Sequence, residues 1–443
     1  MRRFGLPARG GRRMTEPDPR AGRFGRAGDL PAGMQDGLSV LAVAFGLRLC
    51  WILYGPWVHG DSAQYLALAR SIVRHGAFSF DGVTLTAYRP PLYPALIALL
   101  WHGHRPPLLT VYLVQAVLGA MTAVFVYLIA RRAFGRKVAL TAALLVAFGP
   151  MSGRYVATVM TETLFTFLLV GGVLAWGRGR WISAGVALGL ATLTRAVLYP
   201  FVLLLVAAAA WPRWRRLPMV SCGGRAALVA LLVVAPWVVR NYRLVGRPTV
   251  AEAGWTDNLV FGTIRLRVGE RAWPQLLAPH RVEASTAGGH TAAWPTTAVG
   301  VLRYVVHHPG DWLLARLSQY PRLFIDTGGY MLRGSSNLSF AAAWRTGRIG
   351  PLLVQVGMAA GNVVFFVLAA WGLIRERRRL PALLPIWAFP AFLIVAQLPM
   401  YADARYGLPM TPLLAVFAAS VLAAPRTAGT AHSGVPAPVG EAS

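Results

Sequence analysis

The chain has 443 residues, of which 56% are hydrophobic and only 14% are charged, and its mean hydropathy is +0.51. This composition excludes a soluble globular domain and a disordered chain, and it indicates a protein that crosses a membrane several times. The net charge of +28 does not point to a nucleic-acid partner, because many of the arginines flank apolar stretches in the pattern of cytoplasmic membrane edges.

Apolar stretches near the length that spans a bilayer recur along the chain. They predict an all-α polytopic membrane protein with about ten transmembrane helices in the cell (plasma or inner) membrane. The basic residues between them place both termini in the cytoplasm and two long loops, 57–106 and 240–349, on the outer side. The first stretch reads as an uncleaved signal anchor. The predicted spans are 37–56, 107–130, 138–151, 158–176, 181–194, 197–211, 225–239, 350–374, 381–399 and 405–424.

The transmembrane domain, 37–424, is predicted to lie between a disordered basic lead, 1–36, and a disordered tail, 425–443. Cys50 lies inside the first span and Cys222 in a cytoplasmic turn, so no disulfide is expected. The small residues of the pattern from Gly185 to Gly189 are explained by close helix packing.

The two outer loops carry further helical signals. Residues 62–74 have apolar side chains at helical spacing and predict an amphipathic helix in the membrane interface. After a turn at Asp81 and Gly82, a second short helix is predicted over 91–101. In the second loop a helical pair, 297–307 and 310–324, is predicted to be broken at Pro309.

Asp61 lies just before the interfacial helix. With Gln64 three residues later it resembles a capping box, and a capped carboxylate stays ionised and fixed, as a base or a cation ligand must. Arg89 precedes Pro90 and Pro91 beside a helix N-terminus, where a guanidinium binds phosphate well. The alternatives are that Asp61 only caps the helix and that Arg89 only extends toward the interface.

Further charged residues gather at the predicted outer rim. Glu162 opens the fourth span, and an acid at a membrane edge is costly to keep. Arg195, Arg240 and Arg405 lie at the outer ends of other spans; each alone is an ordinary interface anchor, but together they suit an anionic lipid headgroup. Arg48, near the middle of the first span, either pairs helices or faces substrate.

Several motifs are absent from the sequence. There is no P-loop, no glycine fingerprint before a helix, no zinc-protease motif, no nucleophile elbow and no Asp-x-Asp. A soluble nucleotide donor is therefore not expected. A transporter or lipid flippase stays an alternative, although it should show intramembrane acids or broken helices in two related halves. A non-catalytic scaffold is a further alternative.

Six motifs, in this order and on this topology, resemble the GT-C superfamily of polyprenyl-phosphate-sugar-dependent glycosyltransferases. The resemblance covers about residues 38–424 and is closest to the bacterial branch related to protein O-mannosyltransferases and the lipid A aminoarabinose transferase. The motifs lie at 60–65, 88–94, 161–165, 189–195, 236–242 and 404–412.

The resemblance implies transfer of a sugar, with inversion, from a polyprenyl-phosphate carrier to a lipid, glycan or protein acceptor on the outer face. It implies Asp61 as the base or acceptor-orienting group, Glu162 as a second acid, and no required cofactor, with a divalent cation left open. Several relatives carry an Asp-Glu pair where this chain has Asp61-Ser62, which weakens both a metal role and a protein acceptor. An O-antigen-type ligase or polymerase is the remaining alternative. The implied lipid-phosphate ligands are Arg89, Arg195, Arg240 and Arg405, and the implied substrate-cavity residues are Tyr65, Tyr88, Tyr93, Asn241, Tyr242, Asp403 and Tyr406.

Overall fold

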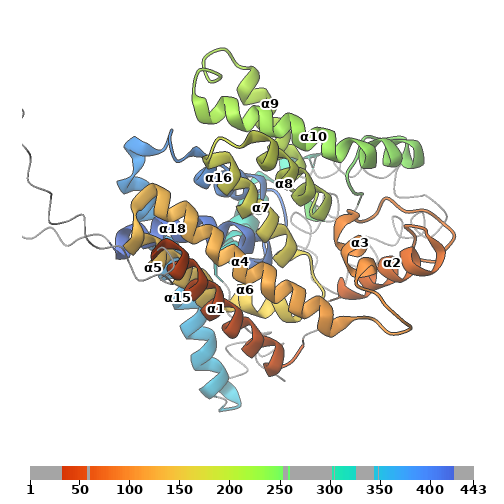
Figure 1. Ribbon diagram of the computed structural model, residues 1–443, viewed down its shortest axis with the longest axis horizontal. Coiled ribbons are helices and arrows are strands. Elements are labelled where there is room, and N and C mark those ends of the chain that lie inside the picture. Colours follow the sequence, from red (N-terminus) through yellow and green to blue (C-terminus); the bar gives the residue numbers. More distant parts are fainter. Residues whose placement is uncertain are drawn as a thin grey trace, which may run out of the picture.

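The computed structural model describes residues 32–56, 60–252, 258–259, 302–303, 305–325, 344–347 and 349–423. Over these ranges the chain is built from helices, and the only β-type pairing there is an isolated bridge between Ser79 and Leu85 (Figure 1). The elements are α1 (Ala32–Tyr54), α2 (Ser62–His75), α3 (Leu92–Leu99), α4 (Leu108–Phe134), α5 (Arg136–Phe148), α6 (Pro150–Arg154), η1 (Tyr155–Ala157), α7 (Glu162–Gly177), α8 (Trp181–Thr194), α9 (Leu198–Ala210), α10 (Pro218–Val245), α13 (Pro309–Gln319), η3 (Tyr320–Leu323), α15 (Ile349–Arg375), η4 (Arg377–Arg379), α16 (Leu384–Ala396), α17 (Ala404–Gly407), η5 (Leu408–Met410) and α18 (Thr411–Leu422).

Each of the ten predicted spans falls on one of these helices or on a short series of them. Among the described residues, five helical stretches are long and apolar enough to cross a membrane: α1, α4, α10, α15 and the run from α17 to α18. The pair α5 and α6 makes a sixth if its bend of 51° lies within one span. The other four, α7, α8, α9 and α16, are apolar but shorter. The all-α polytopic fold is confirmed, and the number of spans stays a prediction.

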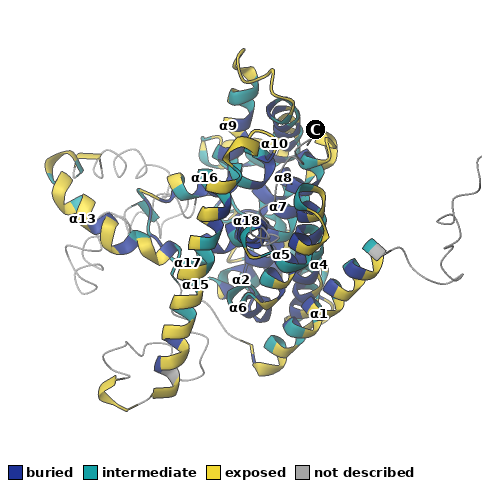
Figure 2. Cartoon of the chain, turned by 90° about the vertical axis from the view of Figure 1, so that its left-hand side faces the viewer, coloured by how far each residue is buried: buried dark blue, intermediate teal, exposed yellow. Residues whose placement is uncertain are grey.

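The buried helices α5, α7, α8 and α18 occupy the centre of the bundle, whereas α1 and α15 lie at its outside with exposed residues along much of their length (Figure 2). Close packing of α8 on α10 depends on small residues. A Cβ at Gly185 would lie 2.4 Å from the carbonyl oxygen of Ala226, and one at Gly189 would lie 2.7 Å from the Cβ of Val233. The packing interpretation of this glycine pattern is confirmed.

The segment 57–106, predicted to be the first outer loop, contains α2 and α3, as predicted, and these two helices pack on each other. The predicted turn is present: Gly82 has φ of 85°, and the Asp81 carboxylate accepts hydrogen bonds from the N–H groups of Val83 and Thr84. The hydrogen bond from the Ser79 hydroxyl, and then those from the backbone, hold the pKa of Asp81 well below its usual value. The turn is therefore fixed with its carboxylate ionised.

The described part of the second outer loop is small. A helix begins at Pro309 and continues through η3, which confirms the predicted break and the second helix of the pair. Most of the predicted helix over 297–307 lies outside the described residues, as do most of the predicted lead and the predicted tail. α1 itself already begins at Ala32.

Arg48 is 1% exposed inside the bundle, where its Nη1 donates to the carbonyl of Ala44. It packs so closely on α4 that a Cβ at Gly119 would lie 2.4 Å from its Nε. This contact supports the helix-pairing interpretation of Arg48. Cys50 and Cys222 are both free thiols, as expected.

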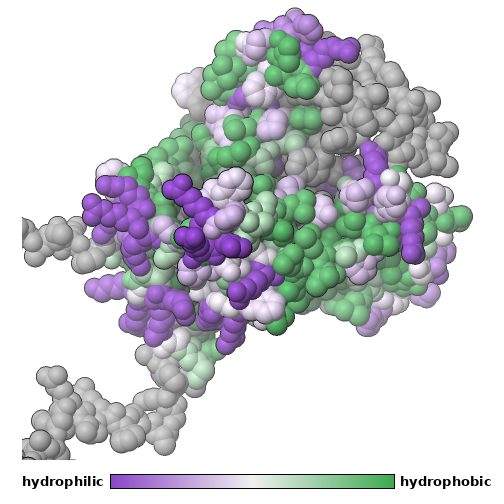
Figure 3. All heavy atoms as spheres, turned by 90° about the horizontal axis from the view of Figure 1, so that it is seen from above, coloured by the Kyte–Doolittle hydropathy of each residue, from purple (hydrophilic) through white to green (hydrophobic). Residues whose placement is uncertain are grey.

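The bundle has two chemically different ends. In Figure 1, α2 and α3 lie at the right-hand end and α5 and α18 at the left-hand end. Seen from above in Figure 3, hydrophobic residues cover much of the middle of the molecule, and hydrophilic residues gather most densely at the left-hand end, with smaller groups at the top and the right-hand edge. The candidate site described next lies at the end that carries α2 and α3.

Candidate functional site

Asp61 lies between two guanidinium groups from distant parts of the chain. Its Oδ1 is 2.9 Å from Nη2 of Arg89, and its Oδ2 is 3.2 Å from Nη1 of Arg405. The side chains are 24%, 16% and 19% exposed, respectively. A carboxylate held in this way stays ionised and is fixed in orientation, because both oxygens accept charge-assisted hydrogen bonds.

The predicted capping box at α2 is wrong. Asp61 does occupy the N-cap position, but its side chain makes no capping hydrogen bond. Gln64 is likewise turned away from the helix start, since its Oε1 accepts from Nε of Arg89 at 2.9 Å and from Nη2 at 2.7 Å. Hydrogen bonds to a charged donor are stronger than those to a backbone N–H, so both side chains bind the guanidinium of Arg89.

Glu162 and Arg195 form a second, deeper pair. Nη1 of Arg195 is 2.7 Å from Oε1 of Glu162, whose side chain is only 1% exposed. The other carboxylate oxygen, Oε2, is buried without a hydrogen-bond partner among the described residues. The guanidinium of Arg195 also lies 5.8 Å from the ring centres of both Phe165 and Tyr406. Arg195 is thus flanked by two aromatic rings, and its partner Glu162 is buried, which strengthens the ion pair.

Aromatic side chains join the two ion pairs into one cluster. The guanidinium of Arg89 lies 5.3 Å from the ring centres of both Tyr65 and Tyr88. On the other side, Arg405 lies 4.8 Å from the ring centre of Tyr406 and donates to its hydroxyl at 2.8 Å. Burial raises the pKa of Tyr65, and the charge of Arg89 lowers it in part. Tyr65 is therefore a neutral phenol within the field of the cluster.

Two other predicted cavity residues serve the framework of this cluster. Tyr93 is fully buried, and its hydroxyl donates to Oε1 of Gln115, whose amide group in turn donates to the carbonyls of Val156 and Thr158. Asp403 caps α17, since its carboxylate accepts from the backbone N–H of Arg405. The first network holds α3 against the segment before α7, and the cap orients the arginine that reaches Asp61.

Three predicted residues on α10 lie apart from the two ion pairs. Arg240 donates to the carbonyl of Thr86 at 2.7 Å and lies 4.5 Å from the ring centre of Trp237. Asn241 is fully buried, and its amide donates to the carbonyls after α10, whereas Tyr242 is 57% exposed. Arg240 thus ties the segment around Thr86 to the end of α10, and Asn241 ties the segment after α10 to the same helix end. A direct role of the three in binding substrate stays a prediction.

Sequence reasoning missed two residues of the site. Gln64 was assigned to the cap, although its place on the polar face of α2 was the available signal for a side-chain partner. Phe165 follows Glu162 by three residues and therefore lies on the same face of α7, which the helical period does predict. No residue of the sequence near Asp61 indicated that its second partner would be Arg405.

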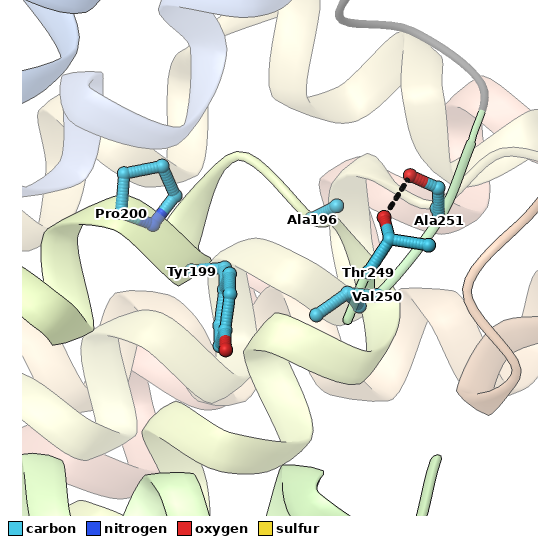
Figure 4. Close-up of a pocket in the computed structure, with 6 residues that line it drawn as sticks. All are labelled: Ala196, Tyr199, Pro200, Thr249, Val250 and Ala251. Atoms are coloured by element: carbon cyan, nitrogen blue, oxygen red, sulfur yellow. Dashed lines mark hydrogen bonds between the residues drawn. The ribbon is translucent and has the colours of Figure 1, made fainter. Parts of the chain in front are cut away.

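A small cavity is lined by residues outside the cluster. It has a volume of about 250 Å³ and lies between the start of α9 and the chain segment after α10. Figure 4 shows its lining, with Tyr199 and Pro200 on one side and the hydrogen-bonded Thr249 and Ala251 on the other. It begins at Ala196, the residue that follows Arg195. Within the described part of the chain, no three His, Cys, Asp or Glu side chains are grouped so that they could hold a metal ion.

Comparison with protein families gives a match over part of the chain. Residues 88–239 match the family described as dolichyl-phosphate-mannose-protein mannosyltransferase. The matched region includes Arg89, Glu162 and Arg195, and it excludes Asp61 and Arg405. The resemblance to the GT-C superfamily of glycosyltransferases is confirmed. No curated protein sequence matches the chain.

Solved structures similar to this chain include the oligosaccharyltransferase of Archaeoglobus fulgidus in its apo form, with 15% identity and a TM-score of 0.49; the alignment covers 87% of this chain and 50% of that one. The same archaeal enzyme, AglB, in complex with an inhibitory peptide and a dolichol-phosphate gives 16% identity, a TM-score of 0.48, and coverages of 87% and 50%. ArnT from Cupriavidus metallidurans bound to undecaprenyl phosphate gives 16% identity and a TM-score of 0.39, with coverages of 88% and 78%. The chain thus spans about half the length of the archaeal enzyme.

Proposed function

We propose that the protein is an integral-membrane glycosyltransferase that moves a sugar from a polyprenyl-phosphate carrier to an envelope acceptor on the outer face of the cell membrane. The observation that carries the proposal is the position of Asp61 between Arg89 and Arg405. One acid and two cations at a membrane edge supply what the reaction needs: a base for the acceptor and positive charge for a phosphate that leaves. The match to a family named for a dolichyl-phosphate sugar donor supports the same chemistry.

The proposed binding step is an exchange of partners. The phosphodiester of the donor, which carries one negative charge on two unbridged oxygens, takes the guanidinium groups of Arg89 and Arg405 from Asp61, because planar guanidinium groups bind phosphate oxygens in a bidentate way. With the arginines on the phosphate, Asp61 then accepts a proton. In the absence of donor the same carboxylate is neutralised by both arginines and is a weak base. The site is thereby set to react only after the carrier lipid has bound.

The proposed chemical step is a single displacement at the anomeric carbon. The acceptor hydroxyl gives its proton to Asp61, and its oxygen forms the new bond to the carbon. The bond from that carbon to the phosphate oxygen breaks, with the electron pair leaving on the phosphate, and the configuration inverts. Arg89 and Arg405 stabilise the growing negative charge on the phosphate. This charge stabilisation comes from guanidinium groups, so we expect no cofactor to be required.

Glu162 and Arg195 are proposed to support the second side of the site. Arg195 lies beside Tyr406, the ring that also contacts Arg405, and within reach of the same phosphate region. The buried Oε2 of Glu162 is available to accept a hydrogen bond from a substrate hydroxyl. The largely apolar cavity from Ala196 to Ala251 is suited to the first isoprene units or to the sugar ring.

The test uses protein reconstituted in nanodiscs with a panel of radiolabelled polyprenyl-phosphate sugars, and it measures release of polyprenyl phosphate. We expect turnover with at least one donor and its loss in Asp61→Asn. The control is Asp81→Asn, in the same loop, where the amide oxygen still accepts from the backbone of the turn. Near-normal turnover of Asp61→Asn would overturn the role of Asp61.

The products separate the remaining classes. Transfer of a single sugar supports the proposal, and transfer of a whole lipid-linked glycan indicates a ligase or a polymerase. Movement of the carrier lipid between leaflets without loss of its sugar indicates a flippase and contradicts the proposal.

A further inference from the structure

A second cavity lies at the end of the bundle opposite to Asp61. Its volume is about 350 Å³, and it is formed where α4 ends, where α5 begins, and where α15 and α18 end. The helix run from α17 to α18 has Arg405 near one end and Ser420 near the other, and Ser420 lines this cavity. The cavity is therefore separated from the candidate active site by the length of a membrane-spanning stretch.

The charged residues that line the cavity are three cations and one acid, namely Arg136, Lys137, Arg375 and Glu376. Glu376 is already paired, because Nη1 of Arg379 lies 3.0 Å from its Oε2. That arginine is also anchored on α4, where its Nη2 donates to the carbonyl of Ala133. The charge of Glu376 is thus neutralised by Arg379, which does not line the cavity.

Arg136 is also engaged. Its guanidinium forms two hydrogen bonds, of 2.7 and 2.8 Å, to the two oxygens of Asp36 at the start of α1. In contrast, Lys137 and Arg375 form no ion pair with any other residue that the structure describes. Both are exposed at the cavity. After these pairings the cavity keeps two cationic side chains that have no counter-charge among the described residues.

The position of the cavity at a membrane edge selects the class of ligand. Three of the stretches that form it, α4, α15 and the run to α18, are long and apolar enough to cross the membrane, and their ends reach the depth of the lipid headgroups. Basic pockets between transmembrane helices bind anionic headgroups. Phe134 and Val138 give the cavity an apolar side that suits the glycerol and the first methylene groups of a lipid.

We propose that this cavity binds the phosphate of an anionic phospholipid, with Lys137 and Arg375 as its cationic ligands. A phosphate held there would join α5 to α15, which both line the cavity. Because lipid binding favours the folded state, such a lipid would stabilise the bundle. The inference does not depend on the proposed transfer reaction, since it concerns the other end of the molecule.

The experiment measures binding of phosphatidylglycerol to the full-length protein in a neutral detergent, by native mass spectrometry and by the shift of the thermal unfolding midpoint. Phosphatidylcholine and inorganic phosphate are the comparison ligands. The test variant is Lys137→Gln with Arg375→Gln. The matched control is Arg132→Gln with Arg378→Gln, which removes the same charge from exposed positions at the same end that do not line the cavity.

We expect phosphatidylglycerol to bind and to raise the midpoint in the wild type and in the control. In the test variant we expect affinity to fall roughly twentyfold or more, at about fivefold for each basic residue near an anionic headgroup. Equal losses in the two double variants would overturn the site. If phosphatidylcholine binds as tightly as phosphatidylglycerol, the charge of the lipid is not what the cavity recognises. If inorganic phosphate alone gives the same stabilisation, the cavity binds a free anion and the proposed phospholipid is refuted.

Discussion

The exchange of partners at Asp61 predicts that Asp61→Asn binds the carrier lipid more tightly than the wild type, although it cannot turn the donor over. In the wild type, a phosphate must displace two ion pairs, of 2.9 and 3.2 Å, before it can contact Arg89 and Arg405. These side chains are partly exposed, so each pair contributes about 1 kcal/mol, between the values for surface pairs and for buried charged hydrogen bonds.

The amide of Asn keeps the size of the side chain and one acceptor oxygen but loses the charge. The two ion pairs together contribute ~2 kcal/mol, and we take roughly half of this as lost in the variant. The free energy that the phosphate must spend to displace the side chain at position 61 is therefore ~1 kcal/mol smaller. A difference of that size corresponds to about fivefold tighter binding. Arg89→Ala has the opposite effect, because it removes a ligand of the phosphate. Asp81→Asn, outside the cluster, should bind as the wild type does.

The assay is equilibrium binding of polyprenyl phosphate without its sugar, measured by isothermal titration in nanodiscs, so that no turnover interferes. It is repeated at low and at high salt, because a purely electrostatic gain shrinks as salt screens the exposed charges. If Asp61→Asn binds the lipid no more tightly than the wild type does, Asp61 and the phosphate do not compete for the two arginines. That result would refute the proposal that donor binding releases Asp61 from Arg89 and Arg405.

The two remaining predictions concern stability, measured as thermal or denaturant unfolding in detergent. Arg195→Ala should lower the free energy of unfolding by up to about 3–5 kcal/mol, because it leaves the buried charge of Glu162 without a partner. Adding Glu162→Gln removes that charge and should restore part of the lost stability. No recovery in the double variant would contradict the reasoning. Asn241→Ala should cost about 1–3 kcal/mol, because the carbonyl of Thr249 loses its donor, whereas the carbonyl of Val250 keeps the indole N–H of Trp237. Its exposed neighbour offers the control, since Tyr242→Ala should stay within about 0.5 kcal/mol.

Much of the fold could be predicted from the sequence, because the signals involved are local. A transmembrane helix satisfies its own backbone hydrogen bonds, so a run of apolar residues is enough to place it, and all ten predicted stretches are helical. The amphipathic period of α2, the glycine turn after Asp81 and the helix start at Pro309 are also local signals. The packing of Gly185 followed from its spacing to Gly189.

The candidate site was only partly predictable. Acids and arginines at one rim could be recognised singly, since a charge at a membrane edge is conspicuous in an apolar sequence. Their pairing could not, and the one pairing that was predicted, between Asp61 and the start of α2, was wrong. A local rule assigned the carboxylate to the nearest backbone N–H groups, whereas two guanidinium groups compete for it more strongly.

The sequence by itself determined which segments form apolar helices and which charged residue types lie at their ends. Only the tertiary structure decided that Asp61 meets Arg405, 344 positions further along the chain, that Glu162 pairs with Arg195, and that Arg240 is held by the first outer loop instead. The physical reason is that hydropathy depends on each segment alone, whereas the partner of a charge depends on which helix ends the packing of the bundle brings together.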